Sequence, residues 1–75
     1  MIVEGIPSGD LECWCLLVTK ETFKQLTGED PDEEFDVGHF AKENSPHRYK
    51  IYPHHLVGFE NKEKLVRISI EVKEL

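Results

Sequence analysis

The fold of this chain is decided by residues 11–28, which read LECWCLLVTKETFKQLTG. Both alternating faces of residues 11–18 are largely apolar, so this segment is expected to be a central strand covered on both sides. Thr19 offers a hydroxyl that can cap a helix over residues 20–27, and Phe23 and Leu26 are spaced to pack that helix on a sheet. Gly28 suits the left-handed conformation that ends a helix.

Outward from this stretch, the sequence predicts further strands on both sides. Residues 1–6 are expected to form a first strand, and the Pro-Ser-Gly-Asp turn at 7–10 would join it to the central strand as a hairpin. Residues 47–52 are predicted to form a third strand, with Tyr49 and Ile51 on one face, and Pro53 ends it.

The end of the chain shows the clearest strand pattern. Residues 65–73 alternate between apolar and polar side chains, which is typical of a strand with one buried face and one wet face. The two sets are Val66, Ile68, Ile70 and Val72 on the apolar face, and Arg67, Ser69, Glu71 and Lys73 on the polar face. This strand is expected to pair with an early strand and close the sheet. A turn or a single helical turn is expected over residues 53–61.

Length and composition predict one α+β domain over residues 1–75, with a small curled antiparallel sheet of about four strands and one or two short helices. No run of residues is apolar enough to span a bilayer, and the first residues lack the pattern of a secretory signal. Cys13 and Cys15 are too close on one strand for an unstrained bridge. Together these features predict a cytoplasmic protein with reduced thiols and no cofactor.

Residues 29–36, with the sequence EDPDEEFD, carry the entire charge imbalance of the chain. Six of these eight residues are acidic, whereas the whole chain has 15 acids against 9 Lys and Arg, for a net charge of −6. The remainder is therefore neutral (9 against 9). The order Asp30-Pro31-Asp32 is typical of a helix start, because exposed N–H groups there favour negative charge. Phe35 would anchor this short helix, and Phe40 is expected to be tucked into the core.

Such a charged segment predicts a binding surface for a protein partner with a basic patch. The predicted contact residues are Glu29, Asp30, Asp32, Glu33, Glu34, Phe35 and Asp36. A solvated loop that only maintains solubility is the alternative interpretation of the same residues. A homo-oligomer is a further option, because self-association would add buried area to a small domain.

Nucleic-acid binding and metal binding are the two alternatives to a protein-binding surface. Arg48, Lys50 and Tyr52 share one face of the third strand and could bind single-stranded nucleic acid by phosphate contact and stacking, although the net charge opposes a polyanion. Cys13 and Cys15, with the histidines at 54–55, could form a small metal-binding domain, but two cysteines one residue apart on a strand are poorly suited to structural zinc. No motif indicates a nucleophile or an acid–base pair, so an enzyme is not expected.

The order of features over most of the chain resembles small phage- or prophage-encoded accessory proteins. The features are an early hairpin, a helix, an acidic loop, the segment Ile51-Tyr52-Pro53-His54-His55-Leu56-Val57-Gly58 and a final amphipathic strand. The resemblance implies a protein that binds and modulates a host enzyme or defence complex. It transfers no functional residue to this chain.

Overall fold

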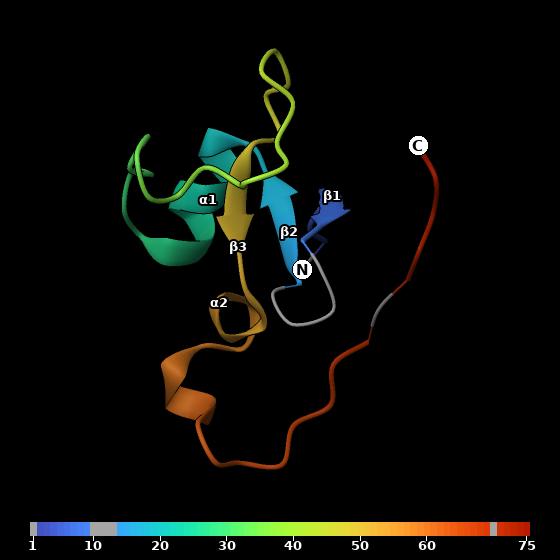
Figure 1. The fold of residues 1–75 in the computed structure, drawn as a ribbon. Coiled ribbons are helices and arrows are strands. Elements are labelled where there is room, and N and C mark those ends of the chain that lie inside the picture. Colours follow the sequence, from blue (N-terminus) through green and yellow to red (C-terminus); the bar gives the residue numbers. More distant parts are fainter. Residues whose placement is uncertain (1, 10–13, 70) are drawn as a thin grey trace.

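The computed structural model describes residues 2–9, 14–69 and 71–75 (Figure 1). Its elements are the strands β1 (Ile6–Ser8), β2 (Cys15–Val18) and β3 (Tyr49–Ile51), the helices α1 (Lys20–Thr27) and α2 (Pro53–Val57), and the 3-10 helix η1 (Phe59–Asn61). The strands form an antiparallel sheet in the order β1-β2-β3, which makes β2 central. The predicted α+β class, antiparallel sheet and pair of short helices are therefore confirmed.

The predicted hairpin is present, but its strands begin and end at other residues. In β1–β2, Ile6 lies opposite Leu17 and Ser8 lies opposite Cys15. Pro7 and Ser8 belong to β1, so the predicted turn is wrong at these two residues, while residues 10–13 lie outside the described part. Proline is tolerated here because β1 is an edge strand, where a missing backbone N–H can face outward.

Helix α1 has the predicted boundaries and caps. The Thr19 hydroxyl accepts a hydrogen bond from the Thr22 N–H at 3.3 Å. Gly28 has φ +80°, and its N–H donates to the Lys24 carbonyl at 2.8 Å. Because the helix follows β2 directly, it lies against the sheet and buries Phe23, which is 5% exposed.

The core is small and lies between α1 and one face of the sheet. Its buried residues are Val18, Phe23, Tyr49 and Ile51, and partly buried apolar side chains, including Leu16 and Leu26, pack around them. The rings of Phe23 and Tyr49 meet edge to face, with 6.2 Å between their centroids. The predicted alternation of the third strand is confirmed at Tyr49 and Ile51, whereas the paired strand is limited to 49–51.

The outer edge of β3 is covered by residues 36–38. Lys50 N–H donates to the Asp36 carbonyl and Gly38 N–H donates to the Arg48 carbonyl, both at 2.8 Å, and Val37 forms a β-bridge with Tyr49. A Cβ atom at Gly38 would collide with the Leu17 side chain. The close approach of this segment to the sheet therefore requires glycine.

The prediction of a fourth strand over residues 65–73 is wrong. The described residues of the C-terminal segment, 65–69 and 71–75, belong to no strand, and Figure 1 shows the segment running outside the sheet. Val66, Ile68 and Val72 are 41%, 53% and 92% exposed, and Ile70 lies outside the described residues. The sheet is therefore open and has three strands, because residues 36–38 occupy one edge and the other edge is the short, proline-containing β1.

Candidate functional site

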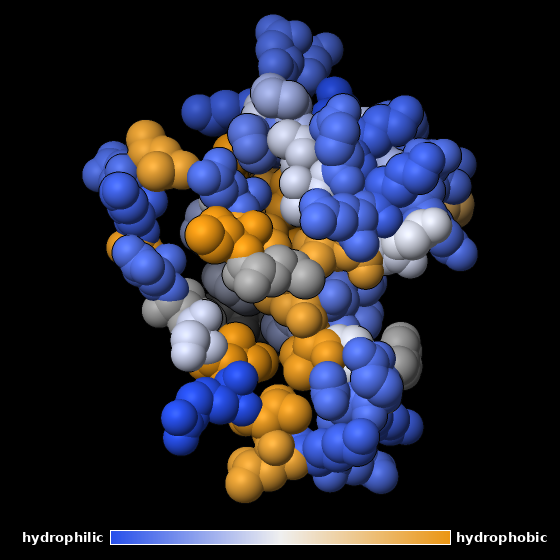
Figure 2. Space-filling model, turned by 180° about the vertical axis from the view of Figure 1, so that it is seen from behind, coloured by the Kyte–Doolittle hydropathy of each residue, from blue (hydrophilic) through white to orange (hydrophobic). Residues whose placement is uncertain are grey.

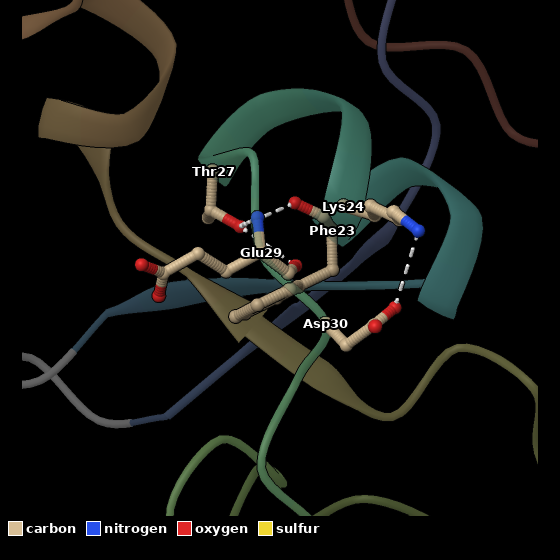
Figure 3. Close-up of polar contacts among 5 residues, drawn as sticks. All are labelled: Phe23, Lys24, Thr27, Glu29 and Asp30. Atoms are coloured by element: carbon tan, nitrogen blue, oxygen red, sulfur yellow. Dashed lines mark hydrogen bonds and ion pairs between the residues drawn. The ribbon is translucent and has the colours of Figure 1, made fainter.

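The acidic segment (residues 29–36) follows α1, and short contacts with that helix hold its first residues in place (Figure 3). The Thr27 hydroxyl donates to the Phe23 carbonyl at 2.8 Å and accepts from the Glu29 N–H at 3.2 Å. Lys24 Nζ lies 3.7 Å from Asp30 Oδ1, and both side chains are well exposed. An exposed ion pair of this kind contributes little stability. The hydrogen bonds between the Thr27 hydroxyl and backbone groups are therefore the stronger restraint.

Asp32 and Asp36 close the middle of the segment into a single turn, which we call the acidic turn (Asp32–Asp36). Asp32 Oδ1 accepts from the N–H groups of Glu34 and Phe35 at 2.7 and 3.3 Å. Asp36 N–H donates to the Asp32 carbonyl at 2.8 Å, and Asp32 N–H donates to Asp36 Oδ2 at 2.6 Å. The predicted helix start at 30–32 is therefore wrong, because these carboxylates satisfy N–H groups within one turn and no helix follows.

Two contacts attach the acidic turn to β3. The Tyr49 hydroxyl donates to Glu33 Oε1 at 2.6 Å, and the Lys50 N–H donates to the Asp36 carbonyl. The hydrogen bond to Glu33, together with burial, raises the pKa of Tyr49 above its ordinary value of 10.0. The phenol therefore stays protonated and keeps donating at neutral pH.

The acidic segment presents its charges and one aromatic ring to solvent. Six of the seven predicted contact residues are exposed, and Asp36 is half-buried. Phe35 is 69% exposed beside Glu34, so it does not anchor the turn to the core. Phe40 is 66% exposed and packs edge to face on His39, with 4.9 Å between ring centroids, which shows that its predicted burial was wrong.

The three side chains of the predicted nucleic-acid face are half-buried in the structure. Arg48, Lys50 and Tyr52 are all intermediate in exposure. Arg48 Nη1 donates to the Glu43 carbonyl at 3.1 Å, and its buried Nε has no hydrogen-bond partner. A guanidinium engaged inside the chain is less available to a phosphate than a free one would be.

Sequence reasoning missed a cluster of aromatic rings at the start of α2. The rings of His54 and His55 lie 4.0 Å apart, and Tyr52 stacks on His54 with 5.9 Å between centroids. His55 Nδ1 accepts the Tyr52 N–H at 3.0 Å. Burial lowers the pKa of His55, the neighbouring His54 lowers it further, and Asp36 opposes this shift. The adjacency of the three residues around Pro53 was the signal that could have indicated this cluster.

The structure does not bring these histidines together with Cys15 in a metal site, as far as its described residues extend. Cys15 is buried in β2, and Cys13 lies outside the described residues. Within the part of the chain that the structure describes, no group of three or more His, Cys, Asp or Glu side chains is arranged to hold a metal ion. The same part contains no helix long and apolar enough to cross a membrane.

Comparison with known proteins adds no family assignment. The chain matches no protein-family model, and it has no significant match to a curated protein or to a solved structure.

Proposed function

We propose that this protein is a small binding module that captures a protein partner through the acidic segment. The observation that carries the proposal is the ordering of the acidic turn by its own carboxylates and by Tyr49, which leaves Phe35 exposed at its end. Because hydrogen bonds already hold the backbone of the turn, little backbone entropy is lost when a partner buries the exposed ring of Phe35.

The acidic residues divide into two groups by what their side chains do. In the first group, Asp32, Glu33 and Asp36 hold the turn through hydrogen bonds, and Asp30 pairs with Lys24. In the second group, the side chains of Glu29 and Glu34 are exposed and face the solvent. The second group supports long-range attraction of a basic surface, since exposed charges speed encounter. Phe35 supplies the apolar contact that charge alone lacks.

The proposed partner therefore has a basic patch next to an apolar pocket large enough for a phenyl ring. The resemblance to phage- or prophage-encoded accessory proteins supports a host enzyme or defence complex as the class of partner. Binding would then modulate or inhibit that partner, with no chemistry performed by this chain.

The test compares the wild-type protein with Glu34→Lys and Phe35→Ala in quantitative affinity capture from host lysate. The same proteins are then titrated with each purified candidate partner. These two positions are chosen because substitution there leaves the hydrogen bonds of the turn in place. We expect Phe35→Ala to weaken binding by at least tenfold, since a buried anchor residue contributes about 2 kcal/mol or more. Glu34→Lys should weaken binding mainly by slowing association, since it reverses a charge that attracts the basic patch. Raising the salt concentration should weaken wild-type binding and have less effect on Glu34→Lys.

Glu60→Lys is the matched control, because it makes the same charge change at an exposed residue of η1. It should bind like the wild type. Equal capture of one partner by wild type, Glu34→Lys and Phe35→Ala would overturn the proposal and leave the acidic segment as a solubilising loop.

A further inference from the structure

The C-terminal segment has the composition of a strand but no strand to pair with in its own sheet. Val66, Ile68 and Val72 alternate with charged or polar residues, and all three are exposed. Single exposed apolar side chains are common on protein surfaces, whereas a row of them along one segment is typical of a surface that another chain covers. Figure 2 shows hydrophobic groups at the bottom of the view, where α2 and the beginning of this segment lie.

Both edges of the described sheet are poor acceptors for this segment. Residues 36–38 already bond to β3 through Lys50 and Arg48. The edge strand β1 is three residues long and contains Pro7, which has no N–H to donate. A strand of nine or more residues would leave most of its backbone groups unpaired on such an edge.

The segment is, in contrast, complementary to itself. If two copies lie antiparallel with Ser69 opposite Ser69, then residues whose numbers sum to 138 face each other. Val66 then lies opposite Val72, Arg67 opposite Glu71, and Lys64 opposite Glu74. Val66 and Val72 match on the apolar face, which ends in the Lys64–Glu74 pairs, and Arg67 and Glu71 pair twice on the polar face because of the two-fold axis. Lys73 is the exception, since it lies opposite Leu65. A register shift by one residue would place apolar side chains on the wrong face.

The apolar face of such a two-stranded ribbon can pack against α2 and the residues that follow it. Val66 lines a groove with Val57 of α2 and with Asn61 and Lys62, and a neighbouring groove runs from Leu56 and Val57 to Ile68 and Ser69. Leu56 is 37% exposed. A two-stranded ribbon alone is marginally stable in water, so contact with these residues is needed to support it.

We infer that this chain forms a two-fold symmetric dimer by antiparallel pairing of residues 64–74 around Ser69. The partner that covers the exposed apolar residues of this segment is thus a second copy of the same chain. The inference is independent of the proposed function, because it uses none of the residues of the acidic segment.

The first test measures the dimer dissociation constant by sedimentation equilibrium of the full chain over a wide concentration range. Glu71→Arg places like charges opposite each other at two positions and should weaken the dimer by about tenfold. Arg67→Glu combined with Glu71→Arg restores both opposite-charge pairs and should return the dissociation constant to near the wild-type value. Glu60→Arg, the same charge change outside the paired segment, should leave it unchanged.

The second test needs no substitution. Wild-type protein is mixed from isotope-labelled and unlabelled copies, and filtered NMR spectra are searched for contacts between the Val66 and Val72 methyl groups of different chains. Such contacts are expected. A monomer at all concentrations, a dimer that is indifferent to Glu71→Arg, a double variant that fails to recover, or a segment paired only with its own sheet would each overturn the inference.

Discussion

His55 is the residue whose charge state is most closely tied to the fold. Its neutral imidazole accepts the Tyr52 N–H at the start of α2, and burial beside His54 lowers its pKa below the ordinary 6.5. The folded state therefore prefers the neutral form. The stabilisation is complete above pH 6.5 and is lost as the pH falls through the lower pKa of the folded state.

We expect the ring protons of His55 to titrate in NMR spectra at a lower pH in the folded protein than in urea. The free energy of unfolding should also fall as the pH is lowered from 6.5 through the depressed pKa of folded-state His55. His55→Asn is the control, because its amide oxygen can accept the same hydrogen bond without titrating, so the variant should show a weaker pH dependence. A midpoint for His55 at or above 6.5 would contradict this account.

Among the elements, the acidic turn depends most on a contact from outside itself. It has no helix to continue into and no buried side chain, so the bond from the Tyr49 hydroxyl to Glu33 joins it to the core. The backbone bond from Lys50 to Asp36 lies next to it. Loss of the first bond should therefore loosen the second.

Tyr49→Phe is expected to lower the free energy of unfolding by about 1 kcal/mol, because one partly buried hydrogen bond is removed while the ring remains packed on Phe23. Urea denaturation measures this, and faster amide exchange at Lys50 should accompany it. Glu33→Ala and the double variant complete a mutant cycle. If the two single effects simply add in the double variant, the hydroxyl and Glu33 do not interact and the turn is held by other contacts.

At the scale of the whole molecule, the balance between a small core and much exposed apolar area is the dominant feature. Among the described residues six apolar side chains are buried, whereas Leu65, Val66, Ile68 and Val72 are exposed in the C-terminal segment alone. Burial of these side chains in a dimer would add to a core that is otherwise near the lower limit for a stable domain. Folding and association are therefore expected to be coupled.

This coupling predicts a melting temperature that depends on protein concentration. Above the dimer dissociation constant, a hundredfold increase in wild-type concentration should raise Tm by roughly 5 °C, because association with a second copy stabilises only the folded chain. A variant that ends at Lys64 should keep the far-ultraviolet signature of the sheet and α1, and its Tm should not change with concentration. A wild-type Tm that is equally insensitive would count against the dimer.

Helix α1 and the alternating burial in β3 follow from the sequence alone. Helix α1 has its predicted bounds because Thr19 and Gly28 act on their immediate neighbours, and the alternating burial of Tyr49 and Ile51 follows from the two-residue period of any strand. The acidic segment was also recognisable as an exposed surface, because its charge cannot be buried without partners.

Only the tertiary structure decided which segments pair at the edges of the sheet. Residues 65–73 have a better strand pattern than 49–51, yet residues 36–38 occupy the edge of β3 and Pro7 limits the edge of β1. Alternating apolar and polar residues indicate that a segment can form a strand. The strand forms only where another strand offers a free backbone edge. For the same reason the acidic turn, which Tyr49 reaches from sixteen residues away, could be located in the sequence, but its anchoring became visible only in the structure.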